Sequence, residues 1–262
     1  GAVAGRFGAG VEKRMALPLQ YSDSELGLLR AIKEASDPAD LCNPEKILPV
    51  STARSHKKGQ QALPRPVLDL VSELQCRVQN STASFICGSG SRLHGRQAGE
   101  KLSTLGLDAV LETDLDGGYI TVGAGMKLSA LAEEFSRLGL KAPFHSRKGT
   151  LGGLLATGQW LPPEGLLVSL SVALADGSTA QFGALSLEPG SGSGAGRLFL
   201  GSWGSYGVLL SATFALYCPV ASPAREQEKP EFRAPSSGPE LKFKKVFDPL
   251  GLLNPGLSQE GA

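Results

Sequence analysis

The chain has 262 residues, of which 41% are hydrophobic and 19% are charged, a balance typical of a globular protein with a buried core. Its net charge of +1 gives no basic field for nucleic acid, and no apolar run reaches the ~18 residues of a membrane-spanning helix. The four cysteines lack C-x-x-C spacing and only three histidines accompany them, which favours buried thiols over a zinc site.

A repeated turn sequence marks both ends of the chain. A helix is predicted from a cap at Ser22 or Asp23 to the Asp-Pro dipeptide at residue 37. Asp-Pro followed six residues later by Asn-Pro occurs at residues 37–44 and again at 248–255, each time after lysines. The repeat indicates two related chain ends joined in one polypeptide. The polar composition of residues 50–65 predicts a linker after the first of them.

The middle of the chain alternates between helical and strand patterns. Apolar residues at helical spacing predict helices over residues 66–79 and 127–138. Short runs of β-forming residues predict strands over 82–87, 109–112 and 119–122. The sequence Asp-Leu-Asp-Gly-Gly at 114–118 joins the last two strands as a hairpin.

The second half predicts more strands and two polar stretches. Strands are expected over residues 166–175, 179–182 and 208–217, and an Asp-Gly turn joins the first two. A Gly/Ser run at 188–196 predicts a flexible loop, and residues 219–242 are expected to be disordered or extended. The whole pattern predicts an α+β fold with antiparallel hairpins and flanking helices, rather than an alternating parallel ladder.

Three glycine-bearing stretches follow or adjoin apolar runs, at residues 87–91, 149–153 and 201–207. Such loops let backbone N–H groups approach a ligand closely. Residues 88–91 suit a diphosphate, with two serine hydroxyls as further donors, and 149–153 suit the face of a planar ring. No G-x-x-x-x-G-K-[ST] sequence is present, so the chain is not predicted to be a P-loop nucleotide hydrolase.

Four stretches together resemble the FAD-binding domain of the vanillyl-alcohol-oxidase superfamily, also called the PCMH type. They are residues 85–93 (FICGSGSRL), 120–128 (ITVGAGMKL), 149–158 (GTLGGLLATG) and 201–208 (GSWGSYGV). The most similar family is the FAD-binding subunit of glycolate oxidase. Residues 8–49 resemble the C-terminal tail of the catalytic glycolate oxidase subunit, and residues 247–256 the C-terminus of the FAD-binding subunit.

The resemblance implies a two-subdomain FAD-binding fold and a role for each glycine loop. The FAD pyrophosphate would be held by Gly88, Ser89, Gly90 and Ser91. The flavin and its ribityl chain would lie by Gly125, Thr150, Leu151, Gly152 and Gly153, and the adenine by Gly201, Ser202, Gly204, Gly207 and Val208. Ser91 stands where covalently flavinylated relatives carry a histidine, so non-covalent FAD is expected. No catalytic residue is assigned: His94 and His145 are expected to be ordinary loop residues.

The implied organisation has four parts: an oxidase-tail segment at residues 1–49, the linker at 50–65, the FAD-binding domain at 66–218, and a polar tail at 219–262 with a short terminal helix and turn. The implied function is an FAD-dependent oxidoreductase subunit, in which flavin accepts hydride from a small 2-hydroxy acid. A catalytic FAD-linked oxidase subunit and an iron–sulfur subunit are the implied partners. The implied location is cytoplasmic, with a peripheral association to the inner membrane through these partners left open.

Two alternatives belong to other classes. The substrate-capping domain expected after residue 218 is reduced to a short polar tail, which favours a non-catalytic interaction subunit with weak or absent FAD binding. The other alternative is an unrelated α+β nucleotide-binding module.

Overall fold

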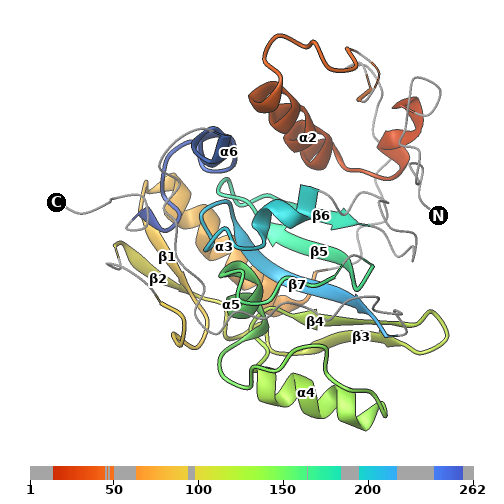
Figure 1. Ribbon diagram of the computed structural model, residues 1–262. Helices are drawn as coiled ribbons and strands as arrows, with labels where there is room; N and C mark the ends of the chain where they lie inside the picture. The colour runs from red at the N-terminus through yellow and green to blue at the C-terminus, as the bar shows by residue number, and fades with distance from the viewer. Residues whose placement is uncertain are drawn as a thin grey trace.

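The computed structural model of the chain describes residues 14–44, 46, 48–49, 63–93, 98–163, 165–183, 195–216 and 239–255. Most of the predicted linker, most of the Gly/Ser run, His94 and the larger part of the polar tail lie outside these ranges. The described residues form a five-stranded sheet, a two-stranded sheet and helices packed on them (Figure 1).

The five-stranded sheet is antiparallel throughout and has the strand order β3-β4-β7-β5-β6. Its strands are β3 (Val110–Asp114), β4 (Tyr119–Gly123), β5 (Leu167–Ala173), β6 (Thr179–Gly183) and β7 (Val208–Ala215). The two predicted hairpins are therefore confirmed. The last strand along the chain, β7, lies between them and joins them into one sheet.

The small sheet is parallel and pairs β1 (Ser84–Cys87) with β2 (Glu100–Ser103). Helix α3 (Arg65–Gln79) packs its buried leucines and valines between this sheet and β7. The chain then returns from far downstream, because Leu253 forms a parallel bridge with Ser84 on the open edge of β1. The end of the described chain thus extends the small sheet.

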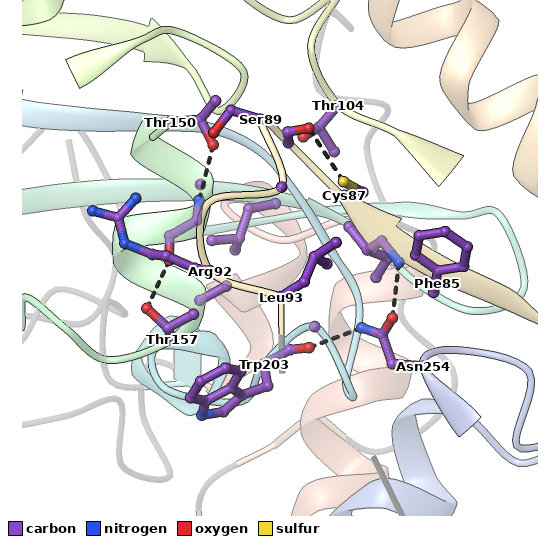
Figure 2. A pocket seen from close by; sticks show the side chains of 18 of the residues that line it. Phe85, Cys87, Ser89, Arg92, Leu93, Thr104, Thr150, Thr157, Trp203 and Asn254 are labelled. Carbon is purple, nitrogen blue, oxygen red and sulfur yellow. Dashed lines mark hydrogen bonds between the residues drawn. The ribbon is translucent and has the colours of Figure 1, made fainter. Parts of the chain in front are cut away.

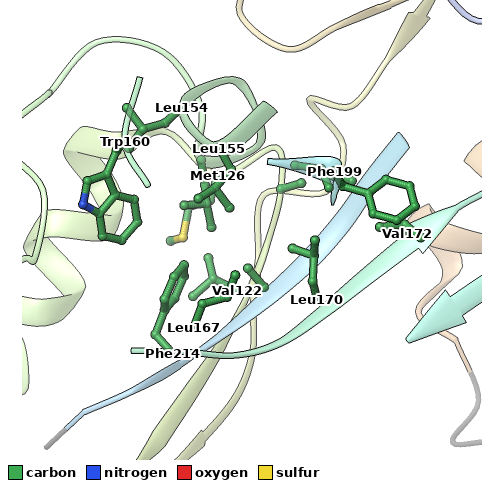
Figure 3. Packing of buried hydrophobic residues seen from close by; sticks show 14 of the residues in the cluster. Val122, Met126, Leu154, Leu155, Trp160, Leu167, Leu170, Val172, Phe199 and Phe214 are labelled. Carbon is green, nitrogen blue, oxygen red and sulfur yellow. The ribbon is translucent and has the colours of Figure 1, made fainter. Parts of the chain in front are cut away.

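The large sheet separates two apolar cores because successive residues of a strand point to opposite faces. Val208 and Leu210 of β7 face the core under α3, whereas Leu209 between them faces the main core. A register shift in the pairing of β5 with β7 interrupts this alternation, and Phe214 further along β7 also faces the main core. Figure 3 shows the main core, where Trp160, Phe199 and Phe214 pack with leucines of helix α5. Helices α4 (Leu128–Arg137), α5 (Leu151–Ala156) and the 3-10 helix η2 (Ala195–Phe199) cover this face.

The amino-terminal segment packs on the edge of the same domain. After the 3-10 helix η1 (Arg14–Leu19), helix α2 (Asp23–Ser36) starts with a capping box in which Ser22 and Glu25 bond each other's backbone N–H groups. Glu25 also accepts a 2.7 Å hydrogen bond from the Gln181 N–H on the edge of β6. Helix α2 further contacts helix α6 (Pro239–Phe247), so the tail-like segment lies against the sheet.

The structure differs from the sequence expectations in four places. Strand β2 was missed, and the glycine stretch at 149–153 leads into helix α5 instead of forming a flat loop. Residues 239–242, expected to be disordered or extended, are the first turn of α6. Two cysteines expected to be buried, Cys42 and Cys76, are exposed. Within the described ranges, no helix combines the length and the apolar character needed to cross a membrane.

Candidate functional site

A pocket lies where the three glycine stretches meet. Its walls are β1 with the turn after it, the start of α5, and the loop before β7 (Figure 2). About 840 Å³ of space lies between these walls when the open solvent at the mouth is included. Nine of the fourteen predicted cofactor-binding residues line it: Gly88, Ser89, Gly90, Ser91, Thr150, Gly152, Gly153, Gly204 and Gly207.

The other five predicted residues lie behind these walls. Leu151 and Val208 are fully buried in the two cores. A Cβ added at Gly125 would lie 2.0 Å from the Thr104 carbonyl oxygen, so this glycine lets two backbone segments pack closely. The Gly201 N–H donates to a carbonyl of α5, and the Ser202 hydroxyl donates to the Phe199 carbonyl. These residues position the pocket rather than line it.

The turn after β1 carries unused backbone donors. Among the described residues, no acceptor is found for the N–H groups of residues 88–91, all of which line the pocket. Gly90 has a φ of +77°, and a Cβ at Gly88 would lie 2.4 Å from the Thr150 hydroxyl oxygen. The turn can therefore rest on α5 only because of its glycines, and it presents its N–H groups as a cradle for an anion.

The start of α5, by contrast, has its donors already paired. Thr150 caps the helix, and its hydroxyl accepts the Gly153 N–H at 3.3 Å. The N–H groups of Leu151 and Gly152 donate to carbonyls of residues 126 and 124. A Cβ at Gly152 would lie 3.0 Å from Ala124, so this glycine seats α5 against the end of β4. The helix therefore contributes a close-packed surface to the pocket, and the anion cradle is the turn after β1.

Arg92 is the one charged side chain among the described residues that line the pocket. Its guanidinium donates to the Gln159 side chain, and to the Ser146 hydroxyl at 2.9 Å. A Cβ at Gly149, which has a φ of +92°, would overlap the guanidinium. Arg92 thus lines the pocket next to the anion cradle and brings a positive charge there. It was not among the site residues predicted from the sequence, although it directly follows the Gly/Ser turn.

Asn254 is a second lining residue that was not selected as a site residue. Its side-chain oxygen accepts the Ile86 N–H and its side-chain nitrogen donates to the Trp203 carbonyl, each at 2.8 Å (Figure 2). A Cβ at Gly204 would lie 2.7 Å from that nitrogen, so this glycine leaves room for the asparagine. One side chain therefore joins β1 to the loop before β7. Its place in the repeated Asn-Pro turn was the available signal.

A buried ion pair fixes the segment that carries Asn254. The Lys244 ammonium bonds the Asp248 carboxylate, and the carbonyls of Ser205 and Leu253 at 2.8 Å each. Burial lowers the pKa of Lys244, and the bond to Asp248 opposes that shift. The Asp248 carboxylate also accepts the N–H groups of Leu252 and Leu253, so the buried pair has its hydrogen bonds satisfied.

Among the described residues that line the pocket, none is a histidine, aspartate or glutamate. His145 is exposed and does not line it, and His94 is outside the described residues. Within the described ranges, no cluster of His, Cys, Asp or Glu side chains could hold a metal ion.

Two family descriptions match the chain. Residues 61–183 match "FAD binding domain" and residues 1–47 match "FAD linked oxidases, C-terminal domain". D-lactate dehydrogenase of Archaeoglobus fulgidus is 27% identical over 202 residues, which are 72% of this chain and 45% of that protein. The chain thus spans less than half the length of this curated relative. Among solved structures, an alkyldihydroxyacetonephosphate synthase matches with a TM-score of 0.45 and 18% identity, over 56% of this chain and 29% of that one.

Proposed function

We propose that this chain, which carries a PCMH-type FAD-binding domain of the vanillyl-alcohol-oxidase superfamily, is an FAD-dependent oxidoreductase subunit that acts on a small 2-hydroxy acid. FAD is the cofactor of this domain. A 2-hydroxy acid is the substrate class named by the D-lactate dehydrogenase to which the chain is similar.

The observation that carries the proposal is the set of unused N–H groups at residues 88–91 with Arg92 beside them. A dinucleotide pyrophosphate bears negative charge on oxygens that accept several hydrogen bonds at once. Converging backbone N–H groups and one guanidinium supply such bonds in a narrow space. The residues present therefore fit FAD, with its pyrophosphate on the turn after β1.

The remaining lining residues suit the rest of the cofactor. Gly152 and Gly153 present a side without bulky side chains, against which we place the flavin and ribityl chain. Gly204 and Gly207 lie with Trp203 and Leu209 on the wall formed by the loop before β7 and the start of β7, where we place the adenine. Ser91 offers a hydroxyl in a position where covalent attachment would need a stronger nucleophile, so the FAD is held non-covalently.

When bound, FAD supplies a two-electron acceptor that takes hydride from carbon 2 of the hydroxy acid, which leaves as the 2-oxo acid. The hydroxyl proton must pass to a base, and the described lining residues include no histidine or carboxylate. We therefore propose that a catalytic oxidase subunit completes the substrate site, with an iron–sulfur subunit as the further partner. This chain's own residues bind the cofactor, orient it and close one side of it.

The experiment is flavin reconstitution of the full chain. We expect incubation with FAD and desalting to leave a yellow protein with about one flavin per chain, released by denaturation. Arg92→Gln should weaken FAD binding about tenfold, whereas Arg137→Gln on exposed α4 should not. A folded but colourless protein, shown by an unchanged circular dichroism spectrum, contradicts the proposal.

A non-catalytic interaction subunit is the second candidate, favoured by the lack of a histidine or carboxylate among the lining residues that the structure describes. Anaerobic addition of D-lactate or glycolate separates the two. Bleaching of the bound flavin, alone or after addition of an FAD-linked oxidase subunit, supports the oxidoreductase. A flavin that dithionite reduces but that no 2-hydroxy acid bleaches under either condition supports the interaction subunit.

A further inference from the structure

Two copies of one turn unit occur in the chain. We define the amino-terminal turn unit as residues 37–44 and the carboxy-terminal turn unit as residues 248–255. Their sequences are DPADLCNP and DPLGLLNP, and each follows a helix whose lysine lies four residues before the aspartate. They differ at only three positions, where Ala39, Asp40 and Cys42 replace Leu250, Gly251 and Leu253.

The two units have the same internal hydrogen bonds. In each, the lysine pairs with the aspartate, and the aspartate carboxylate accepts the N–H groups of the residues four and five positions later. The left-handed backbone positions also correspond, with φ of 49° at Asp40 and 66° at Gly251, and 52° at Asn43 and 46° at Asn254. The amino-terminal turn unit is therefore a preformed copy of the other.

Their surroundings differ completely. The carboxy-terminal turn unit docks on the edge of β1: the Ser84 N–H donates to the Leu252 carbonyl, and the Asn254 N–H donates to the Ser84 carbonyl, both at 2.7 Å. Residues 38–44 are all exposed, and Leu41 is 80% exposed. Among the described residues, the Asn43 side chain makes no hydrogen bond.

The groups left unused on the exposed copy are those that bind β1 in the docked copy. They are the Leu41 carbonyl, the Asn43 N–H and the Asn43 amide, which match the Leu252 carbonyl, the Asn254 N–H and the Asn254 amide. The groups that could bind them are the backbone N–H and carbonyl groups on an unpaired strand edge, together with a loop carbonyl for the Asn43 amide nitrogen. In this chain that edge is occupied, so the exposed copy needs another one.

We propose that the amino-terminal turn unit docks, through Asn43 and the backbone of residues 41–43, on the β1-type edge of a second FAD-binding domain of the same family. This rests on the proposed function only for the kind of partner. The contact adds a strand segment to the partner's small sheet and closes the wall of its pocket, as Asn254 does here. The chain thus completes the cofactor domain of its partner as well as its own.

The first test uses this chain as the partner domain. Asn254→Pro removes the N–H and the amide that hold β1 and cannot adopt the φ of 46°, so it opens the edge in the full chain. We expect this variant to self-associate with micromolar affinity in sedimentation velocity. Adding Asn43→Ala should weaken that association at least tenfold, whereas Asn80→Ala at another exposed asparagine should not. Association that is insensitive to Asn43→Ala overturns the proposal. So does a folded Asn254→Pro variant that remains monomeric at about 100 µM.

The second test holds even if the opened variant does not fold. The triple substitution Leu250→Ala, Gly251→Asp and Leu253→Cys gives the docked carboxy-terminal turn unit the sequence of the exposed amino-terminal turn unit. The Gly251 position has open space for a side chain, and its φ of +66° is a left-handed conformation like the one Asp40 adopts, with φ 49°, at the matching position. Leu210→Cys in the same core controls for the lost leucine volume. We expect the triple variant to unfold within 5 °C of Leu210→Cys. A far lower melting temperature would show that the amino-terminal sequence does not fit a β1 edge. Neither readout involves flavin or substrate, so failure leaves the proposed function standing.

Discussion

Substituting Gly153 by alanine separates cofactor binding from stability, because the two should move in opposite directions. Gly153 lies in α5 and lines the pocket. The nearest atoms to an added Cβ are the Thr150 hydroxyl oxygen at 3.3 Å and Arg92 atoms at 3.9 Å, so a methyl group fits after a shift of a few tenths of an ångström. It then occupies space that we assign to the cofactor.

The expected magnitudes follow from helix propensity and ligand linkage. Alanine in place of a helical glycine raises the free energy of unfolding by about 0.5–1 kcal/mol, less any cost of moving Thr150. A tenfold loss of FAD affinity is about 1.4 kcal/mol. At an FAD concentration 100 times the wild-type Kd, the stabilisation by ligand should fall from about 2.7 kcal/mol to about 1.4 kcal/mol.

The assay is urea unfolding of the full chain with and without FAD, together with a fluorescence titration of the flavin. Gly27→Ala is the matched control, because Gly27 is exposed in α2 and has no atom within 4 Å of an added Cβ. Both variants should be at least as stable as the wild type without FAD, and only Gly153→Ala should lose affinity. Equal FAD affinity in the two variants would refute the placement of the cofactor against α5.

Three further predictions concern the turn units. Asn254→Ala should cost about 1–3 kcal/mol of unfolding free energy in urea, because the Ile86 N–H and the Trp203 carbonyl lose their partner; no change would argue against the docked contact. Lys244→Met should cost about 3–5 kcal/mol by leaving the buried Asp248 carboxylate without its cation, and a loss below 1 kcal/mol would contradict this. Lys33 and two backbone N–H groups lower the pKa of Asp37 from 3.8 to about 2, so its stabilising effect is complete above pH 4 and disappears as the pH falls through 2; an NMR titration of that carboxyl should show this midpoint, and one near 3.8 would disprove the contact.

The local features of the fold could be predicted from the sequence because their signals are local. Ser22 caps α2 and the two Asp-Gly turns close their hairpins where the residues indicate. Strand β2 could not be predicted, since only Leu102 of its four residues is buried and the strand depends on pairing with β1. Helix α5 was hidden by Gly152 and Gly153, whose poor helix propensity is offset by close packing on Ala124.

The candidate site also has features that could be predicted from the sequence and features that could not. Glycine turns that approach another segment could be found from the sequence, and nine of the selected residues line one pocket. The sequence could not predict which loops have unused N–H groups. That depends on whether another segment brings a carbonyl acceptor close, as residues 124 and 126 do for the start of α5. Asn254 reaches Ile86 across most of the chain, and no local pattern encodes such a contact.

The docking of residues 252–254 on β1 also sets the order of events during biosynthesis. A ribosome releases the turn after β1 long before it releases Asn254, so a nascent chain holds half of the pocket without the side chain that joins its walls. Contacts between such distant segments also form late in folding, because a long loop must close first. A chain that stops short of residue 254 therefore lacks the side chain that holds β1 to the loop before β7, even though it already carries every glycine turn of the pocket.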